Sequence, residues 1–383
     1  MVMQAQPFTI AVPQADLDDL QARLALTRWP DEVAGSGWAY GANLAYMREL
    51  VTYWRENYDW REQERQLNAF PQFRVNIDGT TIHFLHVRGN GPHPLPLAVT
   101  HGWPSSFTEM LDILPRLTDP ARFGGDPADA FDVVVPSLPG YGFSTRPPQG
   151  ALTRAQIADL WVHLMVDVLG YPRFGAHGGD VGGGVTNALA RFHAQHLIGV
   201  HLLSVSASLY RGPGAPELSE REREFFAEYD RWDIEQGAYA HIQETRPQTL
   251  AYGLNDSPAG LAAWIVEKFR AWSDCGGDVE RRFTKDELLT NISLYWLTQT
   301  INSSFGPYFV QDDTPPLAKG ERIEVPVAVA LFPKNMDHPP RELAERGYNL
   351  QRWTEMPRGG HFPAHEEPDL LAEDICAFFR SMR

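Results

Sequence analysis

Hydrophobic residues in the first seventy positions recur at spacings of three and four, which predicts helices with one apolar face. The pattern is clearest in "LDDLQARLALTRWPDE" and "LAYMRELVTYWRENYDWREQE". Helices of this kind need a larger body against which to bury the apolar face. We therefore expect residues 1–72 to form a helical N-terminal meander packed on the rest of the chain.

The hydrophobic pattern changes after residue 72. The segment "TTIHFLHV" (80–87) alternates between apolar and polar positions, as a half-buried strand does. Apolar runs that end in turns follow at 94–102, 130–140, 173–177, 198–205 and 325–333. Runs of this length and composition suit strands that are buried on both faces of a mostly parallel sheet.

A helical stripe separates two of these runs in "LTRAQIADLWVHLMVDVLG", where Thr153 and Gln156 form a capping box and Gly170 ends the helix. Strand and helix patterns alternate from about 75 to 205 and resume near 322, whereas the stretch between is aromatic and helical. The fold class we expect is α/β, with a core formed by residues 73–205 and 319–383 and a helical cap at 206–318.

Composition narrows the possible partners and the compartment. A formal net charge of −16 argues against nucleic acid and anionic membranes as partners. No apolar run reaches the roughly 18 residues of a membrane span, and the N-terminus lacks a signal-peptide pattern. The two cysteines have no CxxC spacing. We expect a soluble, cytoplasmic protein.

One aspartate stands among five glycines in "AHGGDVGGGV". Gly178 and Gly182 lie two residues before and two after Asp180, the spacing that a strained strand-to-helix turn needs to present a nucleophile. The alternative is a glycine-rich turn in which Asp180 caps a helix. This window alone leaves both open.

Two further segments supply candidate partners for Asp180. In "THGWPSSFTEM" the backbone N–H of Trp103 could stabilise an oxyanion together with the N–H of Val181, although an ordinary turn is an alternative. In "EMPRGGHFPAHEEP", His361 stands where a catalytic base falls in the order nucleophile, acid, base. Pro363 breaks the helix that a zinc pair with His365 would need, so we expect no metal site.

"HGWP", "PGYGFS", "GGDVG" and "RGGHF", in this order, resemble the epoxide hydrolases of the α/β-hydrolase superfamily. The N-terminal "TRWPDE…GWAYG" and the segment "AYAHIQETRPQTLAYGLNDSPAG" are similar to the microsomal-type branch, which carries an N-terminal meander. The resemblance implies an α/β-hydrolase fold with a cap. Mammalian members of the branch carry a membrane anchor, and we find none in this sequence.

The resemblance also implies a mechanism. Asp180 would attack an epoxide carbon while Tyr239 in "AYAHIQ" and Tyr308 in "SSFGPYF" protonate the ring oxygen. Water activated by His361 would then hydrolyse the alkyl-enzyme ester to a vicinal diol. The expected partners are a small-molecule epoxide and water, with no metal or organic cofactor. Without the resemblance, each tyrosine would be interpreted as a buried aromatic with a satisfied hydroxyl.

The substrate would lie against Trp103, Val181, His101 and Pro104. The family usually has tryptophan where this chain has Val181, so we expect a roomier pocket and a bulkier substrate. Bacterial relatives of this branch include enzymes of natural-product pathways, and a natural-product intermediate would suit such a pocket. A detoxifying role is the other possibility.

A second departure concerns the acid that orients His361. The family places a Glu or Asp after "FPK", but this chain has Asn335 there. We favour Asp337, two residues on, as the triad acid, with the amide oxygen of Asn335 as the alternative.

Other functions remain to be weighed. A haloalkane or haloacid dehalogenase also uses an aspartate at this turn, but it would need halide-binding donors in place of the tyrosines. A catalytically weakened binding protein is suggested only by Asn335. A serine esterase is excluded if Asp180 stands at the nucleophile position. The N-terminal meander could mediate a homodimer or wrap the cap.

Overall fold

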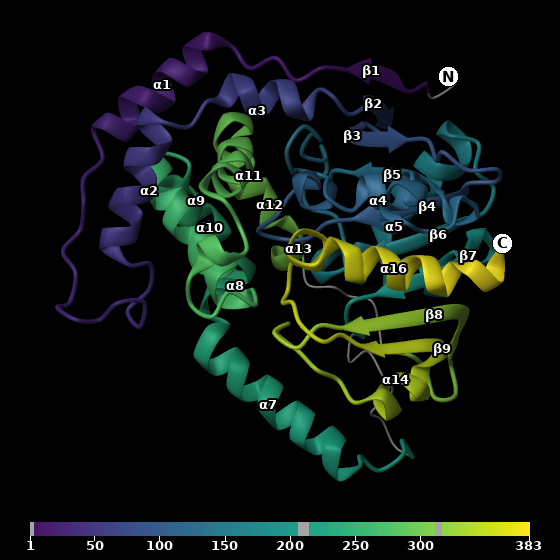
Figure 1. The fold of residues 1–383 in the computed structure, drawn as a ribbon. Helices are drawn as coiled ribbons and strands as arrows, with labels where there is room; N and C mark the ends of the chain where they lie inside the picture. Colours follow the sequence, from purple (N-terminus) through teal and green to yellow (C-terminus); the bar gives the residue numbers. More distant parts are fainter. Residues whose placement is uncertain (1–3, 206–213, 311–315) are drawn as a thin grey trace.

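A nine-stranded sheet forms the centre of the protein (Figure 1). The computed structural model describes residues 4–205, 214–310 and 316–383. In spatial order the strands are β1-β2-β3-β5-β4-β6-β7-β8-β9. Their bounds are β1 Gln6–Phe8, β2 Gln72–Ile77, β3 Thr80–Val87, β4 Leu95–Thr100, β5 Phe131–Pro136, β6 Phe174–Gly178, β7 Leu197–Leu202, β8 Ile323–Leu331 and β9 Tyr348–Glu355.

The sheet is parallel from β5 to β9 and antiparallel from β1 to β5. The expected strand at 80–87 is β3, and the other expected strands are present with ends displaced by up to four residues. The N-terminal segment differs from the helical expectation because β1 pairs with β2 at the edge of the sheet. A three-residue edge strand that contains Pro7 leaves almost no apolar pattern to read.

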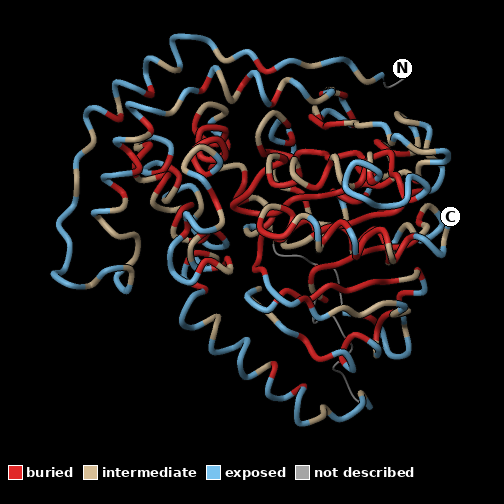
Figure 2. Tube along the Cα trace, in the orientation of Figure 1, coloured by how far each residue is buried: buried red, intermediate tan, exposed pale blue. Residues whose placement is uncertain are grey.

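The two faces of the sheet bury separate apolar clusters because successive strand residues point to opposite sides. On β5, Val134 joins one cluster with the helices α5 (Arg154–Val162) and α6 (Asp180–Phe192). Its neighbours Val133 and Val135 join the other cluster with α4 (Leu114–Thr118) and α16 (Pro368–Phe379). Figure 2 shows the central strands as a continuous buried layer. The fold is the α/β-hydrolase fold that the sequence predicts.

Local signals in the sequence set the helix ends. The predicted capping box of Thr153 and Gln156 is present at the start of α5, which continues into a π-helical turn at His163–Val168. Gly170 has a positive φ of 76° after that turn. Two short helices, α14 (Arg341–Gly347) and α15 (Pro363–Glu366), complete the core.

A layer of helices between the core's two parts forms the cap. Among the described residues of 206–318 there are helices and no strands. Their bounds are α7 Glu220–Gln236, α8 Ala238–Thr245, α9 Pro247–Leu254, α10 Pro258–Trp272, α11 Lys285–Thr298, α12 Ile301–Ser304 and α13 Gly306–Phe309. Figure 1 shows α7 extending away from the other cap helices toward α14.

The N-terminal helices α1 (Gln14–Ala25), α2 (Leu44–Glu56) and α3 (Trp60–Leu67) wrap the cap helices (Figure 1). The Tyr53 hydroxyl donates to Asp286 at 3.0 Å, and the Tyr58 hydroxyl lies 3.1 Å from Oγ1 of Thr290, both on α11. These contacts hold α11 against the N-terminal segment. None of the helices in the described ranges has both the length and the apolar character needed to cross a bilayer.

Candidate active site

Asp180 stands at a sharp turn between β6 and α6. Its φ is +49°, a left-handed conformation that side chains other than glycine seldom adopt. β6 ends at Gly178, and α6 begins at Asp180 itself. The turn lies beside the end of β4, where open α/β sheets bind their ligands. The sharp turn at Asp180 is the backbone conformation that a nucleophile at this position needs.

The glycines around Asp180 are needed for close packing. A Cβ on Gly182 would collide with the carbonyl oxygen of Thr100, and one on Gly178 would collide with the carbonyl of Gly182. A Cβ on Gly102 would collide with the side chain of Asp180. Three missing side chains thus let the Asp180 carboxyl approach the loop that follows β4.

Two backbone amides hold one oxygen of the Asp180 carboxyl. The N–H of Trp103 donates to Oδ1 at 2.9 Å, and the N–H of Val181 donates to it at 2.7 Å. These are the two donors that the sequence predicted for an oxyanion. Cap helix α11 fixes the loop behind them: Asn291 donates to the carbonyl of Pro104 at 2.8 Å, and the Tyr295 hydroxyl donates to the carbonyl of Ser105 at 2.8 Å.

His361 faces the other oxygen of Asp180. Its Nε2 lies 3.5 Å from Oδ2, and both side chains are mostly buried. Burial works against ionisation of both groups, but their mutual attraction dominates. The pKa of the Asp180 carboxyl lies below its usual value, since His361 and the amides of Trp103 and Val181 stabilise the anion. The pKa of His361 lies above its usual value because the Asp180 anion stabilises the imidazolium.

The partner of His361 on its far side is Asn335. Nδ1 of His361 lies 2.8 Å from the amide oxygen of Asn335. The N–H of Met336 donates to the same oxygen at 2.9 Å, which fixes that oxygen as an acceptor and places the proton on Nδ1.

The structure thus places Asn335, and not the favoured Asp337, beside His361. Asp337 accepts a hydrogen bond of 2.6 Å from the Ser204 hydroxyl instead. The residue directly after "FPK", where the family has its acid, is therefore still the one that contacts His361.

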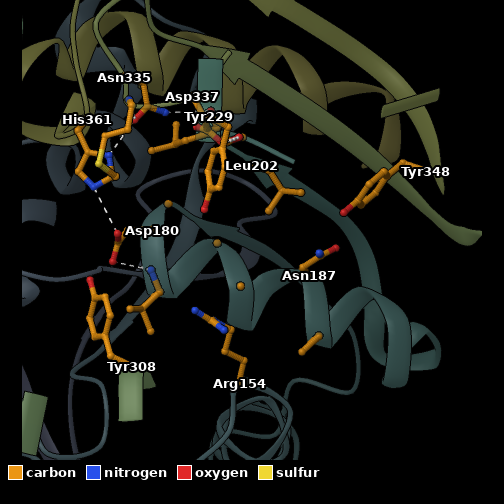
Figure 3. A pocket seen from close by; sticks show the side chains of 18 of the residues that line it. Arg154, Asp180, Asn187, Leu202, Tyr229, Tyr308, Asn335, Asp337, Tyr348 and His361 are labelled. Carbon is orange, nitrogen blue, oxygen red and sulfur yellow. Dashed lines mark hydrogen bonds and ion pairs between the residues drawn. The ribbon is translucent and has the colours of Figure 1, made fainter. Parts of the chain in front are cut away.

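Tyr239 and Tyr308 both lie against the indole ring of Trp103. The Tyr239 ring stacks on it at 5.3 Å with an interplanar angle of 9°, and the Tyr308 ring meets it edge-on at 5.9 Å. Burial, together with the nearby Asp180 anion, raises the pKa of both hydroxyls well above the usual value, so both remain protonated donors. In Figure 3 the Tyr308 hydroxyl points toward Asp180. The structure thus places both tyrosines beside Trp103, which precedes each of them by more than a hundred positions in the sequence.

A pocket of about 500 Å³ opens in front of these residues. Figure 3 shows it extending from Asp180 along α6 toward Arg154, Asn187 and Tyr348. Val181 lines the pocket, as expected. The other lining residues include Tyr229 and Trp232 of α7, Leu202, Leu203, Met336 and Leu317.

His101 and Pro104 are placed differently from the expectation that they line the substrate pocket. His101 is fully buried, and its Nε2 accepts the N–H of Leu138 at 3.2 Å. Pro104 offers its carbonyl to Asn291. Through these hydrogen bonds both residues hold the loop that carries the Trp103 amide. Trp103 and His101 border a smaller cavity behind Asp180.

Sequence reasoning missed the residues behind Asp180 and His361. Glu109, in the 3-10 helix η1 (Phe107–Met110), borders the smaller cavity together with Ser105, Asp180 and His361. The Ser105 hydroxyl donates to the Glu109 carboxylate. The available signal was a carboxylate four residues after a serine within the loop that follows β4. The cap residues Tyr229 and Trp232 gave no signal apart from being aromatic.

Comparison with known proteins decides between the candidate families. The sequence matches the family description "Epoxide hydrolase N terminus" over residues 5–110 and "alpha/beta hydrolase fold" over residues 96–273. It is 37% identical over 401 residues to epoxide hydrolase 1 of Oryctolagus cuniculus, covering 97% of this chain and 88% of the relative. The chain belongs to the epoxide hydrolase family.

Solved structures agree with this assignment. The juvenile hormone epoxide hydrolase of the silkworm Bombyx mori superposes with a TM-score of 0.89 at 30% identity, covering 100% of this chain and 95% of that one. The epoxide hydrolase of Aspergillus niger superposes with a TM-score of 0.86 at 33% identity, covering 99% and 96%. This epoxide hydrolase therefore acts on a small-molecule epoxide and water.

Proposed function

We propose that this epoxide hydrolase works through a covalent ester on Asp180. The observation that carries the proposal is that the two carboxyl oxygens of Asp180 have different partners. Oδ1 is held by the Trp103 and Val181 amides, whereas Oδ2 faces His361 and the pocket. Oδ2 has a weaker partner than Oδ1, the side chain of His361 at 3.5 Å, so it is the better nucleophile, and Oδ1 is already placed where negative charge will develop.

In the first step Oδ2 attacks one ring carbon of the epoxide and the bond from that carbon to the ring oxygen breaks. The ring oxygen takes a proton from Tyr239 or Tyr308. An alkoxide is a poor leaving group, so a positioned acid accelerates this step by about 10² to 10⁴-fold. The products are an alkyl ester of Asp180 and a tyrosinate that later regains its proton.

In the second step a water attacks Cγ of Asp180 and gives a proton to Nε2 of His361. The negative charge collects on Oδ1, where each amide donor is worth roughly 3 kcal/mol by comparison with other oxyanion sites. The tetrahedral intermediate then expels the alcohol, which takes the proton from His361. A vicinal diol leaves with Asp180 as the carboxylic acid, and the remaining proton of the water passes to the tyrosinate, which restores both the Asp180 carboxylate and the tyrosine. Every step uses side chains and backbone of this chain together with water.

Esterification itself prepares His361 for this role. In the free enzyme the Asp180 anion raises the pKa of His361 and favours the imidazolium, which cannot accept a proton. The ester carries no charge, so the imidazolium loses its proton to solvent and His361 is a free base when it is needed. Asn335 orients it by accepting the Nδ1 proton.

We also propose a bulky substrate. The pocket of about 500 Å³ lies within the usual range for sites that enclose a whole small molecule, and Val181 leaves room along one wall. An intermediate of natural-product biosynthesis would meet this requirement.

A homodimer stays a prediction, since the N-terminal helices are packed on the cap.

The test of the mechanism is direct detection of the ester. The enzyme is mixed with excess styrene oxide, quenched in acid within milliseconds and digested. The peptide that contains Asp180 should gain the mass of one epoxide, and Asp180→Asn should abolish that gain. Diol formation without any such adduct in the His361→Gln variant, in which the ester should accumulate, would contradict the mechanism.

A further inference from the structure

The charge balance around His361 is incomplete at the moment of ester hydrolysis. His361 becomes an imidazolium when it takes a proton from water, and a neighbouring anion usually stabilises that state. Its Nδ1 partner, Asn335, is a neutral amide. Asp180 has lost its charge in the ester. A third group must therefore supply negative charge.

Two buried or part-buried carboxyl groups, Glu109 and Asp337, act electrostatically on His361 and favour its charged form. The effect of Glu109 is the larger of the two. Asp337 lies on the substrate pocket, where water or substrate can screen it. Glu109 is only 8% exposed and is separated from bulk solvent. A charge in such a place acts more strongly at the same distance because little water screens it.

The position of Glu109 is fixed by the loop that carries the oxyanion donor. Ser105 donates its hydroxyl to the Glu109 carboxylate, and the carbonyl of Ser105 is itself held by Tyr295. A cavity of about 10 Å³ lies between Glu109, Ser105, Asp180 and His361. That volume admits about one water molecule, which would find polar partners on several sides.

The groups that face Glu109 are Ser105, His361, His365 of α15 and Asp180. Burial raises the pKa of Glu109 to about 7, while Ser105 and the two histidines lower it and the Asp180 anion raises it. When Asp180 becomes an ester, the last of these influences disappears. Ionisation of Glu109 is therefore favoured at the stage when His361 must become charged.

We propose that Glu109 is a positioning residue for ester hydrolysis, whose carboxylate supplies the imidazolium of His361 with the negative charge that Asn335 lacks. The water's proton goes to Nε2 of His361, and Glu109 stays a carboxylate during this step. This inference rests on the covalent mechanism proposed above.

The experiment separates the two chemical steps in Glu109→Gln. An amide keeps the shape and can still accept from Ser105, but it removes the charge. With enzyme in excess over styrene oxide, we expect ester formation to change less than about threefold and ester hydrolysis to slow by about tenfold or more. The acid limb of hydrolysis should move to lower pH, because an imidazole without a nearby anion has a lower pKa. Glu373→Gln, the same change at an exposed position on α16, should alter neither step.

Asn335→Asp provides the rescue. It places a carboxylate at Nδ1 and should restore hydrolysis in the Glu109→Gln background to within about threefold of the parent. The inference is overturned if Glu109→Gln hydrolyses the ester at the parental rate, if both steps fall together with the melting temperature, or if Asn335→Asp brings no recovery. Should no ester form on Asp180 in any variant, the covalent mechanism fails instead.

Discussion

Nδ1 of His361 and the amide oxygen of Asn335 lie 2.8 Å apart, and the N–H of Met336 locks that amide in the accepting orientation. A neutral side chain thus fixes the tautomer of the proposed catalytic base. In the proposed mechanism, Asn335 orients His361 and Glu109 supplies the negative charge, whereas a single carboxylate does both in the usual triad.

Asn335→Ala should slow ester hydrolysis by about 10 to 100-fold, because the imidazole loses its orienting acceptor. Ester formation should change little. Single-turnover mixing, with the Asp180 adduct followed by mass spectrometry, measures both steps. If Asp337→Ala accumulates the ester and Asn335→Ala does not, Asp337 is the functional partner despite its bond to Ser204.

Tyr239→Phe and Tyr308→Phe should each slow ester formation by about 10 to 100-fold, and the double variant should lose more than either, since each removes a proton donor to the ring oxygen. Hydrolysis of an ester already formed should be unaffected. Tyr252→Phe is the control, as its side chain is 74% exposed. Equal losses in both steps would point to a packing role against Trp103.

Ester hydrolysis should titrate at lower pH than His361 does in the free enzyme. The free imidazole has a raised pKa because of the Asp180 anion, and esterification removes that anion. The hydrolysis rate should fall as the pH drops through the lower value, where the base becomes protonated. Proton NMR titration of His361 in the free enzyme gives the first pKa, and the pH profile of single-turnover hydrolysis gives the second. Coinciding values would show that the Asp180 charge does not control the base.

Val181→Trp should shift the preference from large toward small epoxides. The indole adds about 200 Å² of side-chain surface to the pocket wall. The measurement is the ratio of kcat/KM for stilbene oxide to that for propylene oxide, which should fall by about tenfold or more. The Trp103 and Val181 amides are backbone groups, so the oxyanion site is retained. An unchanged ratio would remove Val181 as a determinant of substrate size.

Gly182→Ala should destabilise the fold by about 1–3 kcal/mol, as the added methyl group collides with the carbonyl of Thr100. Gly253→Ala in α9 is the matched control, because a methyl group at that position would meet no atom within 4 Å apart from the adjacent residues and the backbone of its own helix. Alanine there should be neutral or slightly stabilising. Urea unfolding followed by tryptophan fluorescence compares the two variants. Equal stabilities would mean that the turn relaxes freely around residue 182.

Most of the core could be predicted because its signals are local. The strands β4 to β8 are short apolar runs followed by turn residues. The Thr153 capping box can be recognised from four consecutive residues. β1 and β9 lie at the edges of the sheet, and the mixed burial of β9 leaves only a weak pattern. The tyrosine pair came from a resemblance, since nothing local distinguishes these residues from other buried tyrosines.

The triad partner shows where sequence reasoning stops. Asp337 was the chemically better candidate, but the backbone after β8 decides which side chain reaches His361, and it presents Asn335. Glu109 was hidden for a related reason. Its relevance depends on a cavity formed by the end of β4 and the loop after it, the turn at Asp180 and the loop of His361, which come together only in three dimensions.

The covalent ester is tested most directly by a single turnover in heavy-oxygen water, with enzyme in excess over epoxide. If Asp180 supplies the oxygen that enters the product, the diol of the first turnover carries no label, and the label appears in the carboxyl group of Asp180. A labelled diol from that first turnover, with Asp180 unlabelled, would show that water attacks the epoxide directly and would contradict the mechanism.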